Sequence, residues 1–338
     1  MNYFKSLTIL LFVLTSCNPN KKEATKFTIA FGSCNNQVLE NKLWEAIELN
    51  NPSVWIWGGD IIYSDTEDML FMEQNYLNLK NNFEYANFSK NVDVLATWDD
   101  HDYGLNDGGT EYLYKEKAQQ LFLDFLDIPE NDERRLQKGI YHSKDYKIGD
   151  HSIKVLILDT RYFRTALTID SLSNKRYKPN KLGEGTMLGE TQWNWLEKEL
   201  KNSNASFNII VSSIQFLSNE HGFESWGNMP HEIEKLEAML KNTKAKNTIL
   251  LSGDRHISEI SKKNIDGLSY SLIDFTSSGM THSYTSYKNE PNRFRVVDVV
   301  SEKSFGVLHF DFELEIVKME IRGGNNVLFK TFTQKYNL

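Results

Sequence analysis

The 338-residue sequence has little cysteine and proline, no long apolar run and no excess of positive charge. Two cysteines and six prolines exclude a disulfide-rich scaffold and proline-rich linkers. With 38 Lys and Arg against 46 Asp and Glu, the formal net charge of −8 argues against nucleic acid as a backbone-bound partner. The absence of an internal repeat excludes a solenoid. The remaining composition, 40% hydrophobic and 25% charged, is typical of a globular protein with a sizeable core.

The N-terminal residues have the pattern of an exported protein. Lys5 precedes an apolar run over 7–14, which is too short to span a membrane but suits the core of a signal peptide. Leu-Thr-Ser-Cys17 resembles the bacterial lipoprotein box, so we expect 1–16 to be a signal peptide and Cys17 to carry a lipid. Residues 17–26 then form a polar tether. We therefore expect a lipoprotein anchored to a bacterial membrane and facing the periplasm or the cell surface.

Cys34 has no partner for an intrachain disulfide if Cys17 carries a lipid. A lone thiol in an oxidising compartment needs a chemical reason. Cys34 is either a small buried hydrophobic residue or a metal ligand, because coordination deprotonates a thiol and keeps it occupied. Both readings stay open at this point.

Apolar segments with strand character alternate with helical patterns along the chain. Strands are expected over 27–32, 54–57, 92–98, 154–158, 207–211 and 247–251, and helices over 42–49, 112–126, 190–200 and 232–240. Four further strands, 269–276, 306–312, 316–321 and 327–333, are expected to form an antiparallel sheet. The pattern predicts two sheets with helices outside them, in one monomeric domain over 27–338.

Four polar clusters directly follow apolar strands. In a sheet covered by helices, ligands bind at the carboxyl ends of the strands, so the clusters should converge on one edge. Converging carboxylates need cations to offset their repulsion, and a thiolate with a phenolate favours a transition metal over magnesium. The set therefore predicts a site with more than one metal ion. The clusters are Ser33-Cys34, Gly59-Asp60 with Tyr63, Asp99-Asp100-His101-Asp102 and Gly253-Asp254-Arg255-His256.

Other readings exist for some of these residues. Asp99 and Asp102 also fit exposed loop residues that cap turns, and Tyr63 fits a packing aromatic residue. Arg161, after the strand over 154–158, could bind a phosphoryl oxygen of the substrate with two hydrogen bonds. It could equally form a salt bridge with Asp159 or Glu184. The four polar clusters, unlike these single residues, support one another.

The clusters, in this order, resemble the motifs of the PhoD-like alkaline phosphatase family, a branch of the calcineurin-like metallophosphoesterases. The resemblance covers residues 33 to 256. It implies an α/β (α+β) fold, an αββα four-layer sandwich of two mixed sheets flanked by helices. It also implies a phosphate-ester substrate.

The resemblance implies a mixed metal centre. Iron would be held by Cys34, Asp60 and Tyr63, with calcium or another divalent cation beside it. Asp60 would bridge the two ions, and Asp100, Asp254 and His256 would complete the ligands. His101 stands where the superfamily places the histidine that assists the leaving group.

Two positions depart from this picture. Gln215 stands where the common branch of the superfamily has a histidine ligand after a mid-chain strand, so it is a weak ligand or none. His282 follows a later strand and could approach the same edge, although a structural histidine is the favoured reading.

The expected activity is hydrolysis of phosphoric esters. A metal-bound hydroxide would attack phosphorus in line, Arg161 would neutralise the phosphoryl oxygens, and His101 would protonate the departing alkoxide. A phosphodiesterase or phospholipase acting on lipid or wall-polymer diesters could use the same residues. A non-catalytic metal-binding lipoprotein should lack His101 or a bridging carboxylate, and neither is missing. A glycosidase would leave Cys34 and His256 without a role.

Overall fold

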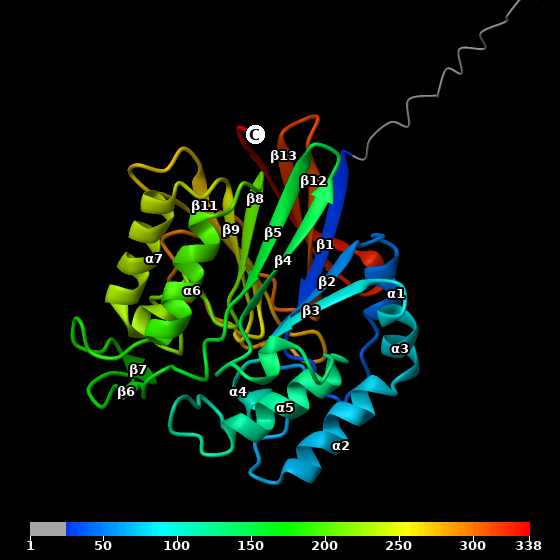
Figure 1. Cartoon of the computed structure of the whole chain (residues 1–338), viewed down its shortest axis with the longest axis vertical. Coiled ribbons are helices and arrows are strands. Elements are labelled where there is room, and N and C mark those ends of the chain that lie inside the picture. Colours follow the sequence, from blue (N-terminus) through cyan, green and yellow to red (C-terminus); the bar gives the residue numbers. More distant parts are fainter. Residues whose placement is uncertain (1–24) are drawn as a thin grey trace, which may run out of the picture.

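The computed structural model describes residues 25–338 (Figure 1). The predicted signal peptide, Cys17 and most of the predicted tether therefore lie outside the described residues. Within 25–338, no helix combines the length and the apolar character that a membrane span requires.

Two six-stranded mixed sheets form the centre of the fold, and we call them sheet A and sheet B. Sheet A contains β14 (Leu328–Lys335), β13 (Ile316–Gly323), β12 (Ser304–Asp311), β1 (Lys26–Gly32), β2 (Val54–Gly58) and β3 (Asp93–Thr97), in this order. Sheet B contains β10 (Ser258–Asn264), β11 (Ser271–Ser277), β9 (Thr248–Ser252), β8 (Phe207–Val211), β5 (His151–Ile157) and β4 (His142–Ile148). A small hairpin pairs β6 (Thr168–Ile169) with β7 (Tyr177–Lys178).

Helices cover both outer faces of the paired sheets (Figure 1). Residues of four of them belong to the core of sheet A: α1 (Trp44–Glu48), α2 (Met69–Lys80), α3 (Phe83–Ser89) and α5 (Lys115–Phe125). Two more, α6 (Gly189–Lys201) and α7 (Pro230–Thr243), pack on sheet B. The short helix α4 (Asp100–Tyr103) directly follows β3, and 3-10 turns occupy Glu133–Arg135, Trp226–Asn228 and Gly324–Asn326.

The central strands are apolar at nearly every position because both of their faces are buried. In β8, Ile209 and Val211 belong to the core between the sheets, whereas Ile210 packs with residues of α6 and α7. All five residues of β8 are buried. This is the pattern expected for parallel strands covered on both sides.

The αββα fold class predicted from the sequence is confirmed, but the assignment of the C-terminal strands to a separate sheet is wrong. Strands β12, β13 and β14 extend sheet A, because β12 pairs antiparallel with β1, with Ile29 opposite Leu308. Strand β11 instead joins sheet B, parallel to β9. Sequence periodicity does not identify the partner of a strand, which for β1 lies 279 residues further along the chain (Ile29 opposite Leu308).

Candidate metal centre

The carboxyl ends of β1, β2, β3 and β9 bring the four polar clusters together, as predicted. Cys34, Asp60, Asp254 and His256 all have positive φ angles, between 51° and 67°. Such left-handed backbone is uncommon for residues other than glycine and is often found at functional sites. Gly59 allows the chain after β2 to lie close to Asp99, because a Cβ atom at Gly59 would lie only 2.5 Å from Cβ of Asp99.

The first group of potential ligands combines a thiol, a phenol, a carboxylate and an imidazole. Ligand atoms of Cys34, Asp60 and His256 all lie within 4.8 Å of one another. Oδ2 of Asp60 accepts hydrogen bonds from Sγ of Cys34 at 3.3 Å and from the hydroxyl of Tyr63 at 3.2 Å. The same hydroxyl lies 3.4 Å from Nε2 of His256. These four side chains could hold one ion.

Two further groups extend the site through shared carboxylates. Asp60 also groups with Asp100 and His101, and Asp100 groups with Asp99 and Asp254, again with ligand atoms within 4.8 Å. Every metal ligand predicted from the sequence thus lies in this connected set or contacts it. Asp60 and Asp100 each belong to two of the three groups.

Burial makes negative charge costly throughout this set. It raises the pKa of the Cys34 thiol to about 11 and is the largest cause that raises the pKa values of Asp60 and Asp254 well above their usual range. The pKa of Asp99 is raised to about 7, because burial outweighs the favourable charge of Arg161. A bound cation would offset this desolvation and favour the ionised ligands.

Asp100 behaves differently from the other carboxylates. Burial raises its pKa, but Arg161, His101 and a hydrogen bond from the Asp107 backbone N–H together outweigh burial and lower it. That N–H lies 2.6 Å from Oδ2 of Asp100. Asp100 is therefore the carboxylate that the chain itself keeps ionised.

His101 is held at the edge of this set by two contacts. Its Nδ1 lies 2.7 Å from Oδ2 of Asp65, and its ring stacks on Tyr63 with a centroid distance of 4.1 Å. Burial lowers its pKa, but Asp65, Asp60 and Asp100 outweigh burial and raise it to about 10. The role of Asp65 could not be predicted from the sequence, because a single aspartate in a loop has no flanking pattern that distinguishes it from other surface aspartates.

Asp99 is fully buried, which corrects the reading of an exposed loop residue. Its Oδ1 accepts hydrogen bonds from Nε of Arg161 and Oγ of Ser213, both at 2.6 Å. Its Oδ2 is buried with no hydrogen-bond partner among the described residues. Because buried polar atoms are rarely left unpaired, this oxygen is the atom of the site that most directly fits the role of a cation ligand.

Arg161 forms buried ion pairs, which matches the salt-bridge alternative for this residue rather than the predicted phosphoryl clamp. Its side chain is fully buried and pairs with Asp99 and with Glu224, whose Oε2 lies 2.7 Å from Nη1. The salt-bridge alternative is right in kind but wrong in partner, because Asp159 accepts the backbone N–H of Arg161 while the guanidinium pairs with Asp99 and Glu224. Glu224 lies in a loop without a strand-end pattern, so no local feature of the sequence singles it out.

Three other residues from the sequence analysis have defined places. Asp102 is buried and accepts the backbone N–H groups of Asp99 and Ile61, so it supports the loop. Nε2 of Gln215 donates to Glu259 and Thr276, and Gln215 belongs to none of the three ligand groups. His282 approaches the site, with its ring 4.4 Å from that of His256. It belongs to none of the three ligand groups, and its Nδ1 lies 2.9 Å from Oγ1 of Thr281, which fits the favoured reading of a structural histidine.

Comparison with known proteins assigns the family. A model described as PhoD-like phosphatase matches residues 29–323. The chain belongs to the PhoD-like phosphatase family. The prediction of a phosphoric ester hydrolase is thereby confirmed at the level of the family.

Individual relatives are more distant. Alkaline phosphatase D of Bacillus subtilis is 29% identical over 122 residues, which cover 32% of this chain and only 20% of that relative. The solved structure of PhoD has a TM-score of 0.72 at 17% identity and covers 93% of this chain and 70% of that one. A dimetal phosphatase from Danio rerio has a TM-score of 0.52 at 13% identity and covers 93% of this chain and 100% of that one.

A further solved structure, the anchor in the inner membrane complex of Plasmodium, has a TM-score of 0.61 at 12% identity. It covers 93% of this chain and 90% of that one. At these identities the structural matches establish the fold alone.

The buried ion pairs of Arg161 predict a large loss of stability on its removal. Arg161→Met should lower the free energy of unfolding by about 3–5 kcal/mol, because Asp99 and Glu224 are left buried without the guanidinium that pairs with them. Lys330→Met, which removes an exposed pair with Asp298, should change it little. Denaturant unfolding of both variants measures this difference. Equal, small effects would mean that Arg161 is free to serve a substrate instead.

Proposed function

We propose that the protein hydrolyses phosphoric esters with cations held at the carboxyl ends of its strands. The observation that carries this proposal is the unpartnered, buried Oδ2 of Asp99, in a carboxylate grouped with Asp100 and Asp254. The family supports a metal-dependent phosphoesterase. When bound, a pair of cations supplies a nucleophile from water at neutral pH and neutralises charge on the phosphoryl group.

The ligand chemistry supports two kinds of ion. The thiol of Cys34, the phenol of Tyr63 and the imidazole of His256 suit iron, with Asp60 as the shared carboxylate. The group of Asp99, Asp100 and Asp254 offers only carboxylate oxygens, which suit calcium or another hard divalent cation. We therefore propose iron with calcium, or another divalent cation, as the cofactors.

His101 acts on the leaving group in this proposal. Its bond to Asp65 engages Nδ1, which leaves Nε2 to donate a proton to the departing alkoxide. The hydrogen bond to Asp65 favours the protonated ring, and stacking on Tyr63 limits its rotation. Arg161 contributes indirectly, because its bond to Oδ1 of Asp99 orients the second oxygen of that carboxylate.

Removal of His101 should discriminate between leaving groups. His101→Ala should reduce kcat for an alkyl phosphate at least about tenfold more than for an activated aryl phosphate, whose phenolate departs without a proton. His309→Ala, a partly exposed histidine of β12, is the matched control and should reduce neither. Metal content is measured on the same samples. Equal losses on both substrates, with the metal retained, would show that His101 orients the phosphoryl group instead.

Cys34 should determine the iron content. Cys34→Ser should lower bound iron and weaken visible absorption from thiolate or phenolate coordination, because the hydroxyl is a poorer ligand for this metal. Ser33→Ala, the neighbouring residue, should keep the iron. Elemental analysis and absorption spectra of the purified variants measure both effects. If Cys34→Ser bound as much iron as the wild type, Cys34 would be a buried hydrophobic residue of the core.

We further propose that the mature protein is a monomer anchored to a bacterial membrane through a lipid on Cys17, and that it faces the periplasm or the cell surface. The support is the sequence Leu-Thr-Ser-Cys17 before a polar segment. Cys17→Ser should move the protein from the membrane fraction to the soluble fraction with its kcat unchanged. A soluble wild-type protein that retains Met1 in its mass spectrum would contradict this anchor.

A further inference from the structure

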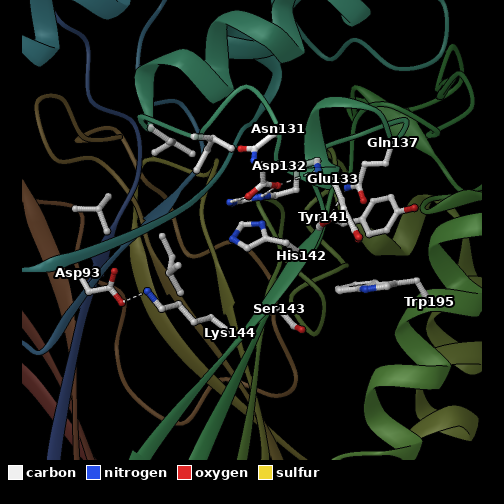
Figure 2. A pocket seen from close by; sticks show the side chains of 15 residues that line it. Asp93, Asn131, Asp132, Glu133, Gln137, Tyr141, His142, Ser143, Lys144 and Trp195 are labelled. Carbon is white, nitrogen blue, oxygen red and sulfur yellow. Dashed lines mark hydrogen bonds and ion pairs between the residues drawn. The ribbon is translucent and has the colours of Figure 1, made fainter.

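A cavity of about 820 Å³ lies at the side of the molecule, between the edge strands of the two sheets (Figure 2). Residues of β3 and β4 line two of its sides, the segment after α5 adds a third, and Trp195 of α6 completes it. Asp93 at the start of β3 lines the cavity, whereas Asp99 of the metal centre follows the end of that strand. Six residues of extended chain separate them by roughly 20 Å. The cavity is therefore distinct from the metal centre.

Both positively charged side chains that line the cavity, Arg134 and Lys144, form ion pairs with carboxylates. Nε and Nη2 of Arg134 donate to the two oxygens of Asp132 at 2.9 and 2.8 Å. Lys144 pairs with Asp93 at 2.6 Å. Figure 2 shows the pair of Lys144 and Asp93 at the cavity wall. With no surplus of positive charge in its lining, the cavity is poorly suited to a phosphate group, which requires unpaired cations or clustered N–H donors.

The remaining polar groups offer both donors and acceptors. His142 lies in the middle of the cavity (Figure 2), and its Nδ1 lies 3.0 Å from the carbonyl oxygen of Ile140. Nδ1 therefore carries the hydrogen, and Nε2 is an acceptor. Burial lowers the pKa of His142 to about 4, so the ring is neutral at pH 7. Arg134 keeps Nη1 as a donor, and the Asn131 amide offers both roles at the rim.

Two aromatic side chains form one wall. The rings of Tyr141 and Trp195 lie 4.9 Å apart at an angle of 54° (Figure 2). Because the rings pack against each other, they leave no parallel slot for a flat base between them. They instead present an apolar surface beside polar groups that both donate and accept. A pyranose ring matches this combination, because it has an apolar C–H face and hydroxyl groups that both donate and accept hydrogen bonds.

We propose that this cavity binds a neutral saccharide, with its apolar face on Trp195 and its hydroxyl groups on His142 and Arg134. The volume lies within the range of ligand pockets and accommodates a short oligosaccharide. The inference stands on the cavity alone and does not depend on the proposed hydrolysis of phosphoric esters.

Calorimetric titration of the purified protein tests this proposal. The probes are three neutral tetrasaccharides: cellotetraose, maltotetraose and tetra-N-acetylchitotetraose. We expect at least one to bind, and Trp195→Ala and Arg134→Ala each to weaken its binding at least about tenfold. Arg293→Ala is the matched control, because Arg293 also pairs with a carboxylate, that of Glu220, but does not line the cavity. This control should bind like the wild type.

Two further measurements separate folding from binding. Far-ultraviolet circular dichroism shows whether each variant folds, and Asn131→Ala, at an exposed residue of the rim, replaces any variant that does not. No binding by any of the three saccharides at about 10 mM would overturn the proposal. Saccharide binding that is as tight in the cavity variants as in the wild type would also overturn it. So would inorganic phosphate that binds more tightly than the saccharides and no longer binds to Arg134→Ala.

Discussion

Buried carboxylates at the carboxyl ends of the strands impose the constraint on which the rest of the structure depends. Asp60, Asp99 and Asp100 are at most 3% exposed, and Asp254 completes their groups. Carboxylates this close cannot all be ionised without compensating positive charge. The chain compensates Asp99 with Arg161, a fully buried arginine, and leaves the remaining charge to cations. Two covered sheets hold this unfavourable arrangement in place, with part of the backbone in left-handed conformations.

The sequence predicted the elements that follow directly from local patterns. Cys34, Asp60 and Asp254 each follow a continuous apolar strand, and such strands end at one edge of a covered sheet. Partners that depend on long-range contacts could not be predicted. Nothing near Glu224 indicates that it meets Arg161, 63 residues away. Strand β4 was also missed, because as an edge strand it has polar residues that interrupt the apolar pattern.

The fold alone does not decide the function. It is shared with PhoD, with a dimetal phosphatase and with an anchor of the Plasmodium inner membrane complex. Function must therefore be argued from the site. The site joins the thiol of Cys34, the shared carboxylate of Asp60 and the unpartnered oxygen of Asp99 in one connected set. His101 lies at the edge of this set, with Nδ1 bonded to Asp65.

Thermal unfolding with and without cations tests the central claim most directly. Ligands that bind only the folded state raise the unfolding temperature by mass action. Protein freed of metal with a chelator should therefore unfold at a lower temperature, and added iron and calcium should restore the original value. Asp99→Asn, which weakens the carboxylate group but keeps its shape, should respond less to calcium. An unfolding temperature that is the same with and without cations would contradict the account, because the buried carboxylates would then need no metal.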